Sequence, residues 1–473
     1  MKMSKLYRIL WVLTLCLPWV ARAQEVSPVD FMRMNPFQIN SNPAADLPYM
    51  SAGAFAVGNL CLTQQNTGLR YDNLFDFDAQ GRPKYLNPSK FANSLKENNS
   101  LAFNMKENVF FGGFRQNKGF LTVAYNINAQ GLVGFDKGLF DLLAKGNSAF
   151  LGEDNPAKGN MGLNAQAYQE WAVGYQLNVT RKLSLGARAK LLFGGVNVNT
   201  DALSLKVVTD PDTYAIRIYE DIAMNLSLPA PARFENGKLL TNGHFAVGDL
   251  FKNVGFGLDL GAEYRFDEQF SMVAAVTDLG FIKWKNGTYR LYGGISDAGQ
   301  FYENGNFLFE GLDVDQLQRI ISDEHYRELF MDTLRDYFRI GSEDLAGYKT
   351  SLRTNLMLRG NYDIDAQNRV SAQVQGCFRE DGFRPAMTLA YSGSFFDMLD
   401  VCATYTMMRG SYTNIGLGLG GNFGTFHIYA ATSNIFGVFT PLNAKNFNLQ
   451  AGIVFNFREA DYTKGTHAPG YLE

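Results

Sequence analysis

Cysteine and histidine are scarce in this chain of 473 residues, which has four of each. The sequence contains no Gly-x-Ser-x-Gly, His-Glu-x-x-His or Cys-x-x-Cys motif, so it offers no recognisable set for nucleophilic or metal-dependent catalysis. Asp76–Gly81 begins like a calcium loop, but Asn87 stands where such a loop has a bidentate glutamate, so we interpret it as a surface turn. We therefore expect no enzyme, no catalytic residues, no metal site and no cofactor.

The few cysteines also exclude a disulfide framework. Cys16 lies in the first apolar stretch, which leaves Cys61, Cys377 and Cys402, an odd and widely spaced set. Small disulfide-stabilised domains have an even number of closely spaced cysteines. We expect the three to be small residues packed within strands, and a single disulfide between two of them is the alternative.

Long apolar runs are almost absent. Only Ile9–Val20 qualifies, and it follows the basic residues Lys2, Lys5 and Arg8. It precedes Ala21-Arg22-Ala23, a small-x-small cleavage site, so residues 1–23 are predicted to be a signal peptide. A membrane anchor is the alternative, but a spanning helix needs roughly 20 apolar residues. No other segment could form a transmembrane helix, which excludes a helical membrane protein.

Neither sign of charge predominates. The chain has 43 basic and 46 acidic residues, and removal of the predicted leader would leave 39 basic against 46 acidic side chains. A mildly acidic chain lacks the basic surface that nucleic acid requires, so we expect no nucleic-acid partner.

Aromatic residues and glycine are abundant, with 38 Phe, 23 Tyr and 47 Gly. Many segments alternate between apolar and polar residues with a period of two. In Val254–Phe266, every second residue from Val254 is apolar, and the residues between them are Gly, Asp, Glu and Arg. Lys182–Phe193 and Leu352–Ile364 repeat the pattern. Alternation over about ten residues predicts strands with one face toward lipid and the other toward a polar lumen.

The polar faces of these strands carry charges of both signs. We expect nine charged residues to face the lumen: Glu170, Arg188, Lys190, Asp259, Glu263, Arg265, Arg353, Arg359 and Asp363. A ring of one sign would indicate ion selectivity, whereas a mixed set indicates ion pairs across a narrow or plugged lumen. The pattern therefore argues against an open porin.

The fold class that follows is all-β: a monomeric, antiparallel transmembrane outer-membrane β-barrel of about 14–16 strands over residues 52–457. A soluble sandwich or barrel is the alternative, but sandwich strands usually have only 5–6 residues. The expected strands include 182–198, 201–209 and 269–283, and the last two of these alternate poorly. The segment 52–62 is the other uncertain member, since it is the candidate to lie outside the wall.

Connection lengths predict the topology. Four connections are long, at 63–106, 136–164, 228–253 and 284–349, whereas others such as Asp210-Pro211-Asp212 are short. Outer-membrane barrels have short periplasmic turns and long external loops, so we expect the four to be extracellular. We also expect helices within them, over Pro88–Lys96, Lys137–Phe150 and Asp313–Phe338, which have helical signals.

The two ends of the mature chain have separate roles in this interpretation. Residues 24–51 contain two Asn-Pro pairs, which disfavour helix and regular strand, and we expect them to form a plug or lead-in segment. Residues 458–473 are polar and are expected to be a periplasmic tail.

The last expected strand, Gln450–Phe457, is similar to the terminal assembly signal of outer-membrane barrels. A polar residue is followed by Gly452 and then by the aromatic residues Phe455 and Phe457. We expect these three residues to be recognised by the barrel assembly machinery, and the two aromatic rings to lie at the membrane boundary.

Two regions carry a resemblance to a known family: Met34–Phe37 with Asn42-Pro43-Ala44, and Tyr168–Tyr175 leading into Leu183–Gly194. Together they resemble an outer-membrane barrel family of Bacteroidota of unknown function, catalogued as domain of unknown function 5723. The early Asn-Pro-Ala is also distantly similar to the openings of FadL-like channels and of PorV and PorP/SprF barrels. The resemblance implies the fold and the outer membrane, and it implies no functional residues.

Two functions remain open from the sequence. The first is a FadL-like passive channel for a small hydrophobic molecule, with the N-terminal segment as its plug. The second is a non-transporting scaffold or accessory barrel of a secretion, gliding or surface-protein complex. Outer-membrane lipid and the barrel assembly machinery are expected partners in both, and either a hydrophobic small molecule or a surface protein would be added.

Overall fold

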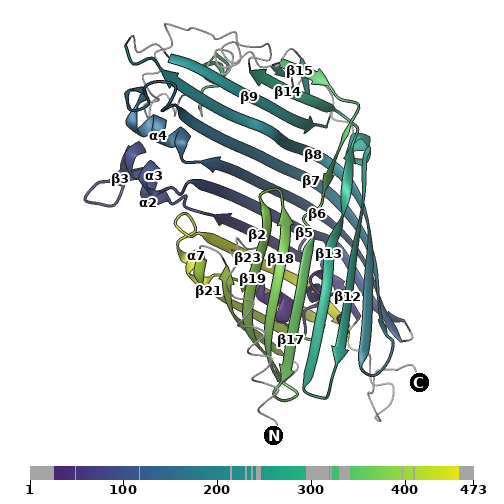
Figure 1. Cartoon of the computed structure of the whole chain (residues 1–473). Coiled ribbons are helices and arrows are strands. Elements are labelled where there is room, and N and C mark those ends of the chain that lie inside the picture. Colours follow the sequence, from purple (N-terminus) through teal and green to yellow (C-terminus); the bar gives the residue numbers. More distant parts are fainter. Residues whose placement is uncertain are drawn as a thin grey trace.

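The strands of this protein close into one antiparallel barrel, seen in Figure 1. The computed structural model describes residues 26–47, 50–116, 118–212, 216–229, 232–235, 238–240, 247–294, 319, 322–329, 341–396, 398–408 and 411–457. The predicted signal peptide (1–23), the predicted tail (458–473) and most of the helix predicted at 313–338 lie outside these residues. Among the described residues, no helix is long and apolar enough to cross a membrane.

The barrel wall has 14 strand positions, within the predicted range. Ten positions are single strands: β5 (Asn98–Gln116), β6 (Gly119–Asp136), β7 (Ala157–Asn178), β8 (Leu183–Thr209), β18 (Asn368–Arg379), β19 (Gly382–Phe395), β20 (Leu399–Met408), β21 (Ser411–Phe423), β22 (Phe426–Thr432) and β23 (Asn446–Phe457). The other four are interrupted: β1 (Met50–Gly53) with β2 (Asn59–Asn66), β9 (Ile216–Ser227) with β12 (Asn253–Arg265), β13 (Phe270–Trp284) with β14 (Thr288–Gly294), and β15 (Gly341–Asp344) with β16 (Tyr348–Ser351) and β17 (Asn355–Asp363).

The seam of the barrel joins the first wall position to the last. Met50 pairs with Phe457, and Leu60 pairs with Ala451, so β23 contacts both β1 and β2. The segment 52–62, which the sequence left open, therefore belongs to the wall. We call the end of the barrel at Phe457 the inner end and the opposite end the outer end.

The side chains confirm the alternation. Leu258 and Leu260 are 37% and 45% exposed, whereas Asp259 between them is fully buried. The same inversion recurs around the wall, where exposed Leu, Ile, Val and Phe alternate with buried Asn, Gln, Thr and charged residues. Apolar residues cover the outside and polar residues fill the inside, the reverse of a soluble protein.

One part of the predicted topology is wrong. The expected strands 182–198 and 201–209 are a single strand, β8, with 27 residues. The turn at Asp210–Asp212 therefore lies at the outer end, although it was predicted to be periplasmic. From residue 198 to 206, side chains on both faces of β8 are partly or fully exposed, so the burial no longer alternates there. The sequence pattern therefore indicates two strands.

The predicted external loop 228–253 is instead an insertion in the side of the wall. Ser227 ends β9 opposite Asn197, and Asn253 begins β12 opposite Gly194, only three residues away along β8. The insertion includes the short strands β10 (Arg233–Glu235) and β11 (Lys238–Leu240) and the 3₁₀ helix η4 (Val247–Phe251). Phe251 of η4 packs edge-on against Phe193.

The remaining outer connections are partly ordered. The helices predicted at 88–96 and 137–150 are confirmed as α3 (Pro88–Ser94) and α4 (Gly138–Lys145), which pack together through Phe91 and Phe140. The other small elements at this end are α2 (Tyr71–Leu74), β3 (Phe75–Phe77), β4 (Pro83–Leu86), η3 (Asn147–Ala149) and α7 (Ile435–Phe439). Of the helix predicted at 313–338, residues 324–329 are helical.

The rim at the outer end is uneven. Figure 1 shows β7, β8, β9 and β14 rising far above β18 and β19, so that one side of the barrel forms a tall wall. β7 has 22 residues and β8 has 27, whereas a tilted membrane crossing needs about 9–11. The tall wall therefore extends well beyond a bilayer-sized belt.

Candidate functional site

Residues 26–47 form a plug inside the barrel, and most of them are buried. Two short 3₁₀ helices give it shape: η1 (Pro28–Phe31) and η2 (Pro36–Asn40). Each begins with proline, and the side chain of the preceding residue, Ser27 or Asn35, accepts a hydrogen bond from the first turn. The first Asn-Pro pair is thus a helix cap, because proline needs no amide partner at that position.

Apolar side chains of the plug pack directly on the wall. The cluster joins plug residues to inward-facing residues of the strands, among them Val26, Phe31, Met32, Phe37, Leu47, Phe111, Phe120, Tyr429 and Val454. Phe37 lies between Phe111 and Tyr429, with ring centroids 5.2 and 6.4 Å away. The plug therefore has its own hydrophobic contact with the barrel and is more than a strand lead-in.

Glycines of the wall make room for the plug. A Cβ atom at Gly186 would overlap the carbonyl oxygen of Pro43, and one at Gly261 would lie 2.9 Å from the amide nitrogen of Ala44. These glycines lie at lumen positions of β8 and β12 where a side chain would push the second Asn-Pro pair away. Close approach of two backbones explains them.

Polar contacts with the wall also hold the plug at several points in the lumen. Arg115 forms a 2.6 Å ion pair with Asp46, and Arg188 donates to the Asn40 side chain at 3.0 Å. Arg359 donates to the Asp30 main-chain oxygen at 2.8 Å and lies over the Phe31 ring. Burial raises the pKa of Asp30, although nearby Arg359 opposes the shift.

A buried charge cluster lies beside the plug. Lys190 Nζ is 2.7 Å from Asp259, 2.5 Å from Asp278 and 3.9 Å from Glu170. Arg188 lies 3.8 Å from both Glu170 and Asp259. Four of the predicted lumen residues therefore meet in one network, and such compensation is what buried charges require.

Asp278 is the member of this network that the sequence did not predict. It lies in a β-bulge of β13, where the register against β12 shifts, and its backbone has φ of 57°. The bulge adds one residue and breaks the alternation, so Asp278 does not fall on either expected face. The weak alternation of 269–283 was the only signal of the bulge.

The other predicted lumen residues lie elsewhere. Arg353 lines a cavity on the outer side of the plug and pairs with Glu380 at 3.1 Å. Glu263, Arg265 and Arg359 line a cavity on the inner side. Asp363 lies next to this inner cavity and binds Arg369 at 2.7 Å.

The outer cavity has a volume of about 210 Å³, and amides are the commonest side chains in its lining. Asn and Gln side chains come from the plug and from strands around the lumen: Asn40, Asn59, Gln65, Asn104, Asn128, Gln130, Asn355, Gln375, Asn448 and Gln450. Charged residues of both signs are interspersed, including Asp30, Lys106 and Arg379. The cavity is therefore rich in hydrogen-bonding groups, with apolar side chains such as Phe37, Phe103 and Met357 between them.

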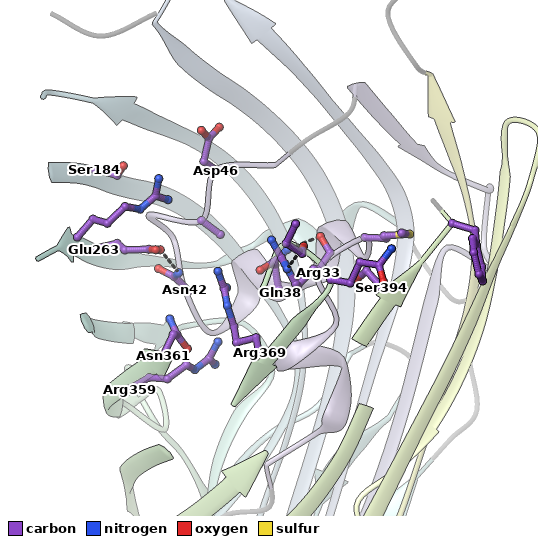
Figure 2. Close-up of a pocket in the computed structure, with 16 residues that line it drawn as sticks. Arg33, Gln38, Asn42, Asp46, Ser184, Glu263, Arg359, Asn361, Arg369 and Ser394 are labelled. Carbon is purple, nitrogen blue, oxygen red and sulfur yellow. Dashed lines mark hydrogen bonds between the residues drawn. The ribbon is translucent and has the colours of Figure 1, made fainter. Parts of the chain in front are cut away.

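The inner cavity is larger, about 560 Å³, and is drawn in Figure 2. Plug residues such as Arg33, Gln38 and Asn42 form one side, and strand residues such as Arg359 and Arg369 form the other. Asn42 donates to Glu263 across the two sides at 3.3 Å. The plug thus separates two cavities that lie toward opposite ends of the barrel.

Reactive groups are sparse in this interior. Cys61, Cys377 and Cys402 form no disulfide with one another, and Cys402 is fully buried. His427 is also buried, with its Nδ1 2.8 Å from Asn422. Within the described part of the chain, no three metal-binding side chains converge on one point.

One family model matches most of this chain. The model of the family of unknown function DUF5723 matches residues 37–433. No curated protein matches this sequence.

Three solved structures are similar in coverage but distant in sequence. A FadL homologue of Pseudomonas aeruginosa is 12% identical with a TM-score of 0.44, covering 93% of this chain and all (100%) of that one. The Pseudomonas putida toluene transporter TodX is 9% identical with a TM-score of 0.40, covering 92% and 98%. The CymD monoaromatic hydrocarbon channel is 10% identical with a TM-score of 0.36, covering 92% and 98%.

Proposed function

Because this chain belongs to DUF5723, a family of unknown function, we propose its function from its own geometry: a gated outer-membrane channel for a small polar solute. The observation that carries the proposal is the position of the plug. It separates two polar cavities, one toward each end of the barrel. Passage between them requires the plug to shift, so residues 26–47 are the gate.

The inverted distribution of side chains supports a membrane location. Exposed apolar residues such as Leu258, Leu358 and Leu419 surround a polar interior. A closed barrel satisfies its backbone hydrogen bonds internally, which a lipid environment demands. Barrels of this kind insert into the outer membrane of bacteria, so we assign the protein there.

The lining of the outer cavity supports a polar solute. The sequence favoured a small hydrophobic molecule, which would need mainly apolar and aromatic walls. Asn and Gln side chains instead offer both donors and acceptors, which suit hydroxyl-rich or peptide-like solutes. The volume of about 210 Å³ limits the bound part to a small group.

The contacts of the plug suit a gate. One of its polar links to the wall, the ion pair of Arg115 with Asp46, is partly exposed, by 30% and 29% of the two side chains. Partly exposed ion pairs contribute about 1 kcal/mol or less each, so they can break and re-form. The apolar contact through Phe37 provides the larger part of the closed-state stability.

Liposome swelling tests the proposal. Folded barrel is selected by its heat-modifiable mobility on gels, and the wild type is compared with a deletion of residues 28–47. We expect the deletion to admit small neutral sugars at least tenfold faster and to raise conductance in planar bilayers. Toluene uptake is measured in parallel. If the deletion speeds the uptake of toluene but not of sugars, the solute is hydrophobic and not polar.

A non-transporting scaffold is the second candidate, and the tall wall favours it. β7 and β8 extend far beyond a membrane crossing and present a rigid surface at the outer end. If the folded deletion variant stays impermeable to sugars and to toluene, the channel proposal is refuted. Cross-linking from the tall wall in intact cells would then be expected to capture a surface protein.

A further inference from the structure

Arginine is concentrated in the inner cavity. Arg33 comes from the plug, Arg265 from the end of β12, Arg359 from β17 and Arg369 from β18, and all four line the same space. These residues are far apart in sequence, and only the closed barrel with its plug brings them together. Figure 2 shows Arg33, Arg359 and Arg369 around this space.

The carboxylates nearby do not balance these arginines individually. Arg369 is satisfied, because it forms two hydrogen bonds with Asp363, at 2.7 and 2.9 Å. Arg33 lies only at the limit of ion-pair distance from the same carboxylate, 4.0 Å, and donates to the Ala366 carbonyl. One carboxylate therefore serves two guanidinium groups.

Among the described residues, the other two arginines have no carboxylate within ion-pair distance, although Asp30 and Glu263 act on Arg359 from farther away. Arg359 is 4% exposed and binds only neutral oxygens, those of Gln373, Asp30 main chain and Ser41. Arg265 makes no side-chain hydrogen bond or ion pair within the part of the chain that the structure describes. A buried cation held by neutral groups attracts an anion strongly, because little water screens it.

The acidic groups that face the cavity are few. Glu263 and Asp46 line it, but Asn42 binds the first and Arg115 the second. Asp365 lies on the exposed turn beside Arg33, where its hydrogen bonds to Asn368 lower its pKa. The space between Arg33, Arg265 and Arg359 therefore holds three guanidinium groups without a close ion pair, although Asp400 acts on Arg33 and Asp30 and Glu263 act on Arg359 from farther away.

We propose that the inner cavity is a binding site for a small multivalent oxyanion, carrying two or more carboxylate or phosphate groups, that holds the plug closed. Guanidinium groups bind such oxygens in pairs, and here they approach from several sides. Amides of Gln38 and Asn361 and the hydroxyl of Ser184 offer further donors around them. A cavity of about 560 Å³ accommodates a ligand of this size.

The ligand would hold the plug in its docked position, because the cavity is formed partly by the plug and partly by the barrel strands. Arg33 and Gln38 belong to the plug, whereas Arg265 and Arg359 belong to strands. An anion that contacts both groups favours the docked plug over any displaced position, which lacks the complete site. Periplasmic anions would thus regulate the gate, and binding itself does not depend on whether the barrel conducts.

Calorimetric titration of the full-length barrel tests the proposal, with citrate and pyrophosphate as probes at constant ionic strength. We expect saturable one-to-one binding, and Arg265→Gln and Arg33→Gln should each weaken it at least tenfold. Arg265 is exposed, so its substitution should not disturb folding. Arg290→Gln, an exposed residue of β14 near the outer end, is the control with the same change in charge and should bind as the wild type does.

Hydrogen exchange of the plug supplies a second, independent readout. Saturating anion should slow exchange of residues 26–47 in the wild type and not in Arg265→Gln. Equal weakening by Arg265→Gln and Arg290→Gln would mean non-specific attraction and would overturn the proposal, as would the absence of saturable binding. Binding of the free anion is also compared with binding of lipid vesicles whose headgroups carry phosphate. Tight binding to the vesicles alone would mean that the ligand is a lipid headgroup and not a soluble anion.

Discussion

Individual residues decide whether the plug fits. Gly186 and Gly261 allow the plug backbone to approach the wall more closely than any side chain permits. Their effect is local, because each contacts one turn of the plug around Pro43.

Gly186→Val is expected to displace the plug without unfolding the barrel. Overpacking of this kind costs about 1–3 kcal/mol, so the undocked population should rise roughly tenfold to a hundredfold. Hydrogen exchange of residues 26–47 measures it. Gly162→Val on β7 is the control, since a Cβ atom there meets nothing within 4 Å, and equal effects of the two substitutions would remove the steric explanation.

Asp30 should make plug docking depend on pH. Burial raises its pKa above the unfolded value of about 3.9, so its contribution to stability is full below that value and is lost as pH rises through the raised pKa. Asp30→Asn should abolish this loss and stabilise the docked plug at neutral pH relative to the wild type. Denaturant midpoints from pH 4 to 8 measure it, and parallel curves for the two proteins would contradict the assignment.

The strands carry the membrane contact. A Lys at Leu358, on the outer face of β17, should cost about 2–4 kcal/mol at the middle of a bilayer. The same substitution at Asn355, which lines the outer cavity, should cost much less. Folding titrations into lipid vesicles measure both variants, and equal costs would mean that the outer face of β17 does not contact lipid.

The terminal strand β23 explains why Gly452 belongs to the expected assembly signal. A Cβ atom at Gly452 would overlap the carbonyl oxygen of Gly58, which lies in the interruption between β1 and β2. Phe457 is exposed on the outer face, opposite Met50 at the seam.

Removal of residues 458–473 should leave a heat-modifiable barrel in the membrane, because β23 ends at Phe457. Phe455→Ala combined with Phe457→Ala should instead leave unfolded protein in the periplasm. Gel mobility and fractionation distinguish these outcomes. Normal folding of the double variant would show that the two aromatic rings are not part of the signal.

The whole molecule shows which features the sequence could predict. The barrel was predictable because each strand repeats one rule, apolar residues outside and polar residues inside, as Leu258, Asp259 and Leu260 illustrate. The continuity of β8 was not predictable, because both of its faces are partly or fully exposed over residues 198–206. The split strand β9–β12 was not predictable either. Its two halves are separated by an insertion in the sequence and are aligned only because both pair with β8.

These two topological errors compensated each other. Reading β8 as two strands, and β9 and β12 as two more, added an even number of crossings, so the direction of every later strand was unaffected. The inner cavity could not be predicted, because Arg33 and Arg369 meet only after the plug enters the closed barrel. Long-range closure, and not local pattern, creates that site.

The direction of the barrel gives a prediction for the intact cell. Protease should cut within 67–97 and 137–156 from outside, because these connections lie at the outer end with α3 and α4. The short turns near Arg181 and Ala366 at the inner end should stay intact until the outer membrane is permeabilised. The opposite order of cleavage would reverse the orientation.

The plug also contacts the strand that closes the barrel. Ser27 donates a hydrogen bond to Gln450, and Asn456 donates one to the Met34 main-chain oxygen, so both partners in the wall belong to β23. β23 is the last strand to be synthesised, and the plug precedes β1 on the other side of the seam. We therefore expect the plug to enter the lumen before β23 pairs with β1 and β2, and to form part of the surface on which β23 docks.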